Sequence, residues 1–388
     1  APAGASWEWT QAKELVLRMP ANARYFSVAA LPDASEATLA DFRAVAHAFP
    51  TDTRFDGSYD PKSSRVRTTF RVDTVAKEGD NKTTFMGLYP HHWNAMAQKP
   101  ATEHQYESVR GPIRLVRGNE FAIERTYHGF VPAWGGLENP GHKEAVESLL
   151  VGDFAKSDQL FTQQQGRGTY WYGKALGAIA QLMSIAEAQG DLRKRDQLLE
   201  KLKSRLEYWF DGKSGSHFVH DASIGSFLGI PQEYESITAM NDHHFHYGYW
   251  VTAAAHVALR DPAWASKDAW GGMVEKIIAD IANAERGRAD FPFLRNYDPY
   301  EGHSWASGTA DFDAGNNQES SSEAINAWAG LILWGEATGD TRLRDLGIYL
   351  YSSEIASIRQ YWFDPEREVL APEFGKPFAS MVFGGMYA

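Results

Sequence analysis

The sequence contains 388 residues, carries a formal net charge of −12 and has no cysteine. The acidic balance argues against a nucleic acid or an anionic membrane surface as partner, because phosphate groups are bound by basic faces. Without cysteine there are no disulfides or thiolate metal sites, and no apolar run reaches the roughly 18 residues of a membrane-spanning helix.

Aromatic residues are numerous, with 13 Trp, 17 Tyr and 21 Phe. Aromatic rings bury large areas, so most of them are expected in the core. Flat rings also stack on the faces of sugars, and the composition leaves both interpretations open.

The first part of the chain, residues 1–135, is predicted to be mostly β. Short β-rich runs are bounded by Pro and Asn and lie at residues 14–19, 25–29, 65–72, 83–89 and 113–116. A short helix is expected at 39–48. This pattern predicts a β-sandwich portion with a linking region.

The turn-rich stretch 135–141 marks the predicted boundary, and residues 136–388 form the second predicted domain, with residues 142–388 mostly helical. Apolar residues there recur every three or four positions. Gly190-Asp191 and Gly339-Asp340 each suit the end of one helix and the start of the next, and Asp261-Pro262 is a looser version. Repeated helix pairs of this kind close into a ring or a solenoid.

Residues 241–250 gather one carboxylate, three imidazoles and four aromatic rings ahead of an apolar helix. Asp242 is either a helix N-cap or a chemical group at the mouth of the core. His243, His244 and His246 are either hydrogen-bonding or sugar-contacting residues, or ligands of a metal. No second cluster of His and carboxylate supplies further ligands at a familiar spacing, so we expect no metal.

Residues 316–324 open another predicted helix, with Glu319 and Glu323 four residues apart and therefore able to share a face. Ser320 and Glu323 also match a capping box, which would give Glu323 a structural role. Glu319 has no such capping role and follows the amides of Asn317 and Gln318.

Residues 295–308 form a long predicted loop that contains Tyr297, Tyr300 and Trp305. Long loops within compact domains are often functional. The loop either contacts a substrate or is anchored by its own rings.

Taken together and in this order, the three segments resemble glycoside hydrolase family 81, the endo-β-1,3-glucanases. The matching stretches are 241–249, 298–308 and 317–324, supported by 172–177 and 88–92. The resemblance covers the chain from about residue 15 to its end.

The resemblance implies an α+β multidomain protein, with a β-sandwich portion followed by an (α/α)6-type helical toroid. Fewer helices are predicted after residue 140 than the twelve of a full toroid, so we expect an incomplete toroid, in a fragment or in a shortened relative. It further implies cofactor-free, endo-acting inverting hydrolysis of β-1,3-glucosidic bonds in glucans of the laminarin and curdlan type. Asp242 would be the general acid, Glu319 the general base and Glu323 a helper.

Inverting glycosidases hold their two carboxyls about 6.5–9.5 Å apart so that a water molecule fits between them. The expected contacts to the glucan are His243, His246, Tyr247, Tyr249, Asp298, Tyr300, His303, Trp305, Asn317 and Gln318.

Two alternatives of other classes remain open. One is a non-catalytic β-glucan-binding protein, which would have no need for the three carboxylates. The other is a metal-dependent hydrolase built on His243, His244 and His246. We expect a secreted, monomeric protein without a nucleic-acid or membrane partner, although the first residues lack the basic and apolar segments of a signal peptide.

Overall fold

The computed structural model describes residues 2–102, 104–162 and 168–386. The chain divides into two compact units, Ala1–Asp56 with Thr68–Ile123, and Gly57–Arg67 with Glu124–Ala388. Gly57 belongs to the second unit because a Cβ there would lie 3.1 Å from the ring of Tyr349. The two units are defined by contacts within each of them, whereas the predicted boundary at residue 135 was placed where the hydrophobic periodicity changes. The predicted domain division therefore stays a prediction.

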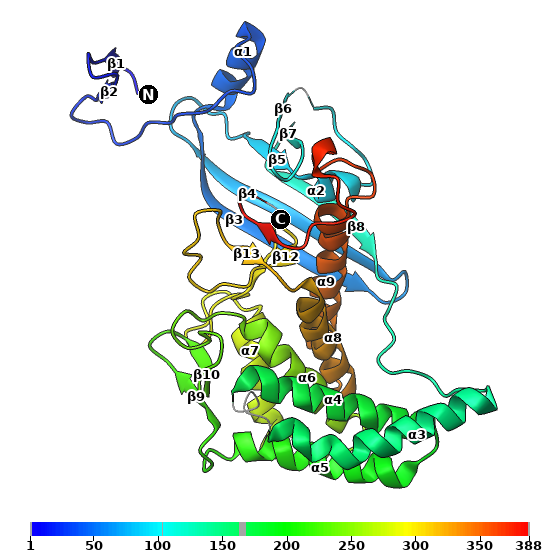
Figure 1. The fold of residues 1–388 in the computed structure, drawn as a ribbon. Helices are drawn as coiled ribbons and strands as arrows, with labels where there is room; N and C mark the ends of the chain where they lie inside the picture. Colours follow the sequence, from blue (N-terminus) through cyan, green and yellow to red (C-terminus); the bar gives the residue numbers. More distant parts are fainter. Residues whose placement is uncertain (1, 103, 163–167, 387–388) are drawn as a thin grey trace. The chain divides into compact units, whose positions relative to one another are not determined.

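The first part of the chain is mainly β (Figure 1). Its elements in chain order are β1 (Ser6–Trp9), β2 (Leu15–Arg18), α1 (Glu36–Val45), β3 (Ala48–Asp60), β4 (Arg65–Ala76), β5 (Phe85–Leu88), α2 (Pro90–Asn94), β6 (His104–Tyr106), β7 (Ile113–Arg117) and β8 (Glu120–Thr126). They form one pair of strands, β1-β2, and two three-stranded sheets in the orders β3-β4-β8 and β5-β7-β6.

Burial along β4 largely follows the period of a strand. Val66, Thr68 and Phe70 are buried at alternate positions, and Thr69 between the last two is buried as well. Phe70 stacks on Phe121 of β8 with ring centroids 4.9 Å apart. The strand predicted at 25–29 is not regular, and its Phe26 and Val28 side chains are exposed, so no buried face holds it extended.

The second unit is mainly helical after residue 140. Its helices are α3 (Pro140–Lys156), α4 (Thr169–Ala188), α5 (Leu192–Phe210), α6 (His243–Ala258), α7 (Gly272–Ala282), α8 (Ser321–Thr338) and α9 (Thr341–Ile358). Short strands pair antiparallel as β9 (His217–Asp221) with β10 (Ser226–Ile230), β11 (Tyr297–Asp298) with β12 (His303–Ser304), and β13 (Asn317–Gln318) with β14 (Val382–Phe383). The fold class is therefore mixed α and β, as predicted. Among the described residues, no helix is long and apolar enough to cross a bilayer.

The predicted helix pairs form at the two Gly-Asp turns. Gly190 and Gly339 take left-handed backbones with φ of 82° and 76°. The carboxylate of Asp191 then accepts a bond from the amide of Lys194 at 3.0 Å, and Asp340 accepts from the amides of Arg342 and Leu343 at 3.1 Å. Each turn therefore ends one helix and caps the next.

Helices α4, α6 and α8 pack side by side and run in the same direction. Between α4 and α6, Thr169 bonds to His246 at 2.8 Å and Ser184 lies 3.5 Å from His256. Between α6 and α8, a Cβ on Gly248 would lie 2.7 Å from that of Ala327. One turn further along both helices, a Cβ on Gly330 would lie 2.7 Å from the hydroxyl oxygen of Thr252. The N-terminal ends of the three helices therefore lie at one end of the unit.

The close approach of α6 and α8 predicts a penalty for Gly248→Ala. The added methyl group would overlap Ala327, so the helices must separate, and we expect a loss of about 1–3 kcal/mol in the free energy of unfolding. Gly152 of α3 has nothing within 4 Å of the built Cβ. Gly152→Ala should therefore stabilise by about 0.5–1 kcal/mol through helix propensity. Urea unfolding of both variants checks the pair, and equal effects would contradict the packing argument.

Candidate functional site

Asp242 stands at the first position before α6, with a backbone that turns its side chain away from the helix. Its φ of 59° is left-handed, whereas a capping residue is normally extended. The carboxylate makes no capping bond and instead accepts from the side-chain amide of Asn241 at 2.8 Å. The amide N–H of Asp242 donates to the carbonyl of Ala306 at 2.9 Å. The N-cap interpretation therefore accounts for the position of Asp242 but not for its carboxylate.

The carboxyl of Asp242 is held in its protonated form. It is only 7% exposed. Burial, followed by the negative charges of Glu319 and Glu323, raises its pKa to about 8. Its Oδ1 atom is buried and has no hydrogen-bond partner among the described residues. A carboxyl that keeps its proton at neutral pH has the property that a general acid needs.

Glu323 does not form the predicted capping box. Ser320, the N-cap residue of α8, makes no side-chain capping bond. The carboxylate of Glu323 accepts a bond from the hydroxyl of Tyr249 at 2.8 Å. Glu319 lies just before the helix and is exposed, and its charge reaches Asp242. The three carboxylates therefore come together at the N-terminal ends of α6 and α8.

Because Glu323 does not cap α8, Glu323→Gln should reduce activity without reducing stability. We expect the melting temperature to stay within about 2 °C, since no capping bond is lost and the side-chain oxygen of Gln can still accept from the Tyr249 hydroxyl. Asp340→Ala is the control, because Asp340 does cap α9. It should lower the free energy of unfolding by about 1 kcal/mol and leave activity intact. Differential scanning calorimetry and reducing-sugar release measure the two effects, and a large fall in the melting temperature of Glu323→Gln would restore the capping role.

Two residues at the start of α4 lie beside Glu323 and were not among the predicted site residues. The hydroxyl of Tyr170 is hydrogen-bonded to Glu323, and its pKa is raised by burial and then by the charge of Glu323. The ammonium of Lys174 lies 3.4 Å from the same hydroxyl. Their i, i+4 spacing at the start of an apolar helix matches that of Glu319 and Glu323, which is the signal that could have found them.

His246 lies one turn after Asp242. Its Nδ1 is 2.8 Å from the hydroxyl of Thr169, and its Nε2 is buried without a hydrogen-bond partner among the described residues. Burial, and then nearby His243, lowers its pKa to about 3, so the ring is neutral. The ring packs 5.2 Å from that of Tyr170. His246 therefore belongs to the same cluster as Tyr170.

His243 and Tyr247 face the interior of the helical unit. The two ring nitrogens of His243 lie 2.6 Å from the carboxylate of Asp280 and 2.6 Å from the carbonyl of Ser236. Burial opposes the ionisation of Asp280, but His243 and then Arg295 lower its pKa. The hydroxyl of Tyr247 donates to the carbonyl of Phe227 at 2.5 Å. Both predicted contact residues are fully buried and have partners within the protein, so neither side chain offers an accessible atom to a glucan.

The loop 295–308 is organised by several of the predicted contact residues. Asp298 accepts bonds from the amides of Tyr300 and Glu301 at 2.9 and 3.1 Å. His303 is buried, with its ring 4.5 Å from that of Trp305. Tyr300 and Trp305 are half-buried, whereas Tyr297 is buried. Asp298 and His303 therefore shape the loop, and Trp305 keeps an accessible part.

Asn317 and Gln318 join this loop to Glu319. The carbonyl of Asn317 accepts from the amide of Ala306 at 2.7 Å. Gln318 is buried and donates to the hydroxyl and the carbonyl of Ser304 at 2.6 and 2.9 Å. Because Ala306 also accepts from Asp242, one stretch of backbone connects the acid segment to the Glu319 segment.

His244 lies in a second buried network. Its Nε2 is 3.0 Å from the hydroxyl of Ser304, which donates to Glu354 at 3.1 Å. Burial raises the pKa of Glu354 to about 8. The three histidines thus point to different partners, and among the described residues no group of three or more His, Asp or Glu side chains could hold a metal ion.

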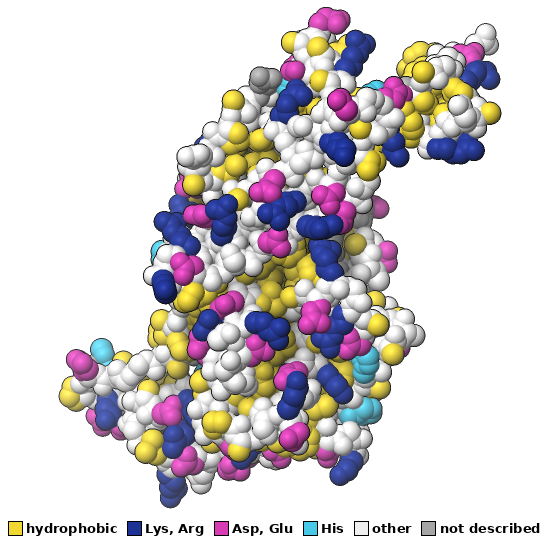
Figure 2. All heavy atoms as spheres, turned by 180° about the vertical axis from the view of Figure 1, so that it is seen from behind, with side chains coloured by type: hydrophobic (Ala, Val, Ile, Leu, Met, Phe, Trp, Pro, Cys, Tyr) yellow, Lys and Arg dark blue, Asp and Glu magenta, His cyan; other side chains and the backbone are white. Residues whose placement is uncertain are grey.

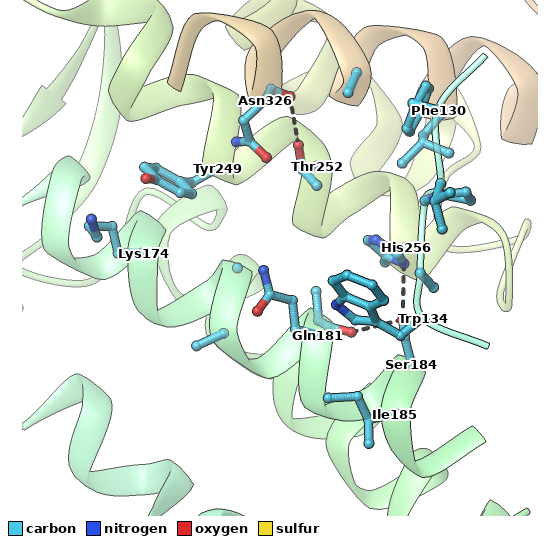
Figure 3. A pocket seen from close by; sticks show the side chains of 18 residues that line it. Phe130, Trp134, Lys174, Gln181, Ser184, Ile185, Tyr249, Thr252, His256 and Asn326 are labelled. Carbon is cyan, nitrogen blue, oxygen red and sulfur yellow. Dashed lines mark hydrogen bonds between the residues drawn. The ribbon is translucent and has the colours of Figure 1, made fainter. Parts of the chain in front are cut away.

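A cavity of about 590 Å³ opens beside the carboxylate cluster (Figure 3). Lys174 of α4, Tyr249 of α6 and Asn326 of α8 line one part of it. Trp134 and His256 line another part, and Asp242, Glu319 and Glu323 are not in its lining. Tyr249, which lines the cavity and bonds to Glu323, therefore connects the cavity to the cluster.

Charge is mixed on one face of the molecule. On the face drawn in Figure 2, Lys and Arg side chains alternate with Asp and Glu, and no large area carries basic groups alone. Such a face offers no continuous path for a phosphate backbone.

Comparisons with known proteins identify the family of the chain. The sequence model "Glycosyl hydrolase family 81 C-terminal domain" matches residues 141–384. A glucan endo-1,3-beta-D-glucosidase of Acetivibrio thermocellus is 44% identical over 100% of this chain and 50% of its own length. A protein of the same name from Thermobifida fusca is 37% identical over 99% of this chain and 50% of its own.

A solved structure gives the same result. It is a mutant of a glycoside hydrolase family 81 protein from Clostridium thermocellum, with a TM-score of 0.95 and 43% identity, covering 100% of this chain and 54% of that one. The chain spans about half the length of the curated relatives it matches. On these matches, the chain belongs to glycoside hydrolase family 81.

Proposed function

We propose that the chain carries the catalytic machinery of a secreted endo-1,3-β-glucanase, which hydrolyses internal bonds of β-1,3-glucan with inversion. The observation that supports this most is the buried, protonated carboxyl of Asp242 beside the exposed Glu319. Inverting hydrolysis needs one carboxyl with a proton to give and one carboxylate in contact with water. A glucan-binding protein without catalysis has no need to raise the pKa of a carboxyl in this way.

In this proposal each carboxyl has one task. Asp242 gives its proton to the leaving glycosidic oxygen. Glu319 takes a proton from a water molecule that attacks the anomeric carbon from the opposite face of the sugar. Burial and then the charge of Glu319 keep Asp242 protonated, and Glu323 adds its own negative charge to these effects. The products are two shorter glucans, and the acid and base are restored by exchange of one proton with solvent.

The proposed glucan contacts are the residues that lie near these carboxyls and keep accessible atoms. They are Trp305 and Asn317, with the neutral ring of His246 behind them. Tyr300, on the same loop as Trp305, is a further proposed contact. Tyr249 instead donates its hydroxyl to Glu323. Asp298, His303 and Gln318 support these contacts through the loop 295–308.

Helices α4, α6 and α8 run in the same direction, and α5 and α9 follow α4 and α8 directly after short turns. Helix pairs of this kind build an (α/α)6 toroid, and we propose that helices α4 to α9 are part of one. We propose that the β sheets of the first part belong to a β-sandwich. The protein is proposed to act as a monomer outside the cell, where polymeric glucan is found, without a nucleic-acid or membrane partner.

The proposed function is tested with the purified chain and linear β-1,3-glucan. Release of oligosaccharides of many lengths from the start of the reaction is expected, since internal bonds are cut. The matched control is the double variant Asp242→Asn/Glu319→Gln, and a β-1,4-glucan is the control for linkage. Binding of glucan without any release would favour the non-catalytic alternative, and loss of activity on treatment with a strong chelator would favour the metal-dependent one.

Trp305 offers a separate test of how the glucan is bound. Its ring is half-buried, and the next residue, Ala306, bonds to both Asp242 and Asn317. Taking the roughly 0.5–1.5 kcal/mol of an aromatic pair as the scale for stacking of a ring on a sugar, Trp305→Ala should weaken binding of long oligosaccharides by about 3- to 10-fold. Isothermal titration on an Asp242→Asn background measures this effect without turnover. Equal weakening for a disaccharide and a hexasaccharide would contradict a distinct stacking site.

A further inference from the structure

The environment of Glu323 consists of side chains from two other helices. Tyr249 of α6 donates its hydroxyl to Glu323 at 2.8 Å, and Tyr170 of α4 is hydrogen-bonded to the same carboxylate. Behind them, the ammonium of Lys174 lies 3.4 Å from the Tyr170 hydroxyl. Two hydroxyl donors therefore converge on one carboxylate, and a cation lies against one of these donors.

Lys174 is held mainly by aromatic faces. Its ammonium lies 5.2, 5.6 and 5.7 Å from the ring centroids of Tyr170, Trp171 and Tyr249. Cation–π attraction of this kind fixes both the cation and the rings. Because Lys174 contacts both tyrosines that bond to Glu323, it links the orientation of one hydroxyl to that of the other.

From this geometry we infer that Tyr170, Tyr249 and Lys174 are positioning residues, which hold the carboxylate of Glu323 in the one orientation that serves Asp242. The inference rests on the proposed function, because it assigns a task to Glu323 within that reaction. The three residues act on the reaction through Glu323 rather than through the sugar. A hydrogen bond to a charged group is among the stronger ones in proteins, so two of them suffice to fix a side chain that the helix itself does not cap.

Moving Glu323 has a consequence for the acid. Several other titratable or charged groups lie in the region of Glu323 and Asp242. They are Tyr170 and Lys174 from α4, His246 and Tyr249 from α6, Glu319 before α8, and Glu233 and Tyr234 from the loop before α6. The charge of Glu323 is one of the causes that raise the pKa of Asp242. If Glu323 turns away, that contribution shrinks and Asp242 loses its proton at lower pH.

The test is a double-mutant cycle between Tyr249→Phe and Glu323→Gln, with kcat and KM measured on linear β-1,3-glucan from pH 4 to pH 9. Loss of a hydrogen bond to a charged group predicts a fall in kcat of about 10- to 100-fold for Tyr249→Phe. KM should change little, and the alkaline limb of the pH profile should move to lower pH. On the Glu323→Gln background the same substitution should cost less than about 3-fold, because its effect passes through Glu323.

Tyr172→Phe is the matched control on α4. Its hydroxyl donates to the backbone carbonyl of Arg205 at 3.1 Å, in the core. It should leave the pH profile unchanged, whereas Tyr170→Phe and Lys174→Met should move the profile as Tyr249→Phe does, and Lys174→Arg should restore part of the wild-type behaviour.

Independent effects of Tyr249→Phe and Glu323→Gln, or an increase in KM alone, would overturn the inference and make Tyr249 a direct glucan contact. That outcome leaves the proposed function standing as long as Asp242→Asn is inactive. Full activity of Asp242→Asn would instead remove the proposed function itself.

Discussion

Asp242→Asn is expected to lower kcat/KM on linear β-1,3-glucan by about 10²–10⁴-fold, the usual contribution of one general acid. Asn has nearly the same shape and tolerates the left-handed backbone that Asp242 adopts. The loss would therefore come from the proton and not from the fold. Initial rates of reducing-sugar release measure it.

The leaving group distinguishes an acid from any other essential residue. When a laminari-oligosaccharide carries fluoride or dinitrophenolate as its leaving group, that group departs without being protonated. Asp242→Asn should therefore retain most of the wild-type rate on that substrate while remaining inactive on glucan. An equal loss on both substrates would show that Asp242 is not the acid.

The pH dependence follows from the pKa of about 8 for Asp242. The acid must be protonated, so kcat/KM of the wild type should fall as pH rises through about 8. The same group links stability to pH. Because its pKa is raised above the value near 4 of an unfolded chain, its contribution to stability is full below pH 4 and is lost as pH rises to about 8. Urea unfolding should show the wild type losing stability relative to Asp242→Asn across that range.

Glu319→Gln should have the second large effect, again about 10²–10⁴-fold in kcat. The side chain is exposed and lies outside α8, so the amide should not disturb the fold. Unlike the acid variant, this variant should stay inactive on the fluoride or dinitrophenyl substrate, because water must still be activated. Near-full activity with either substrate would contradict the role of Glu319 as base.

The sequence predicted which segments approach each other better than it predicted what each side chain does. The clusters at 241–250 and 316–324 do meet, because both open apolar helices that run in the same direction. A capping box of Ser320 and Glu323 was an equally valid interpretation of the same residues. Only the orientation of the Glu323 carboxylate toward Tyr249 distinguishes the two.

Burial was the property that the sequence predicted least well. His243 and Tyr247 lie in the same ten residues as Asp242, but they are fully buried and bond to Asp280 and Phe227. A helix rotates by about 100° per residue, so neighbours in the sequence separate into core and site. Tyr170 was missed because its partner Glu323 lies 153 residues further along the sequence, with several helices between them.

The most direct measurement of the central proposal is proton NMR of the anomeric centre in the first product released from β-1,3-glucan. Direct attack by a water molecule activated by Glu319, with Asp242 as acid, predicts that the new reducing end appears first as the α anomer and then mutarotates to the equilibrium mixture. First appearance of the β anomer would mean retention through a covalent intermediate. Glu319 would then not be a base that activates water in a single displacement, and the proposed mechanism would be contradicted.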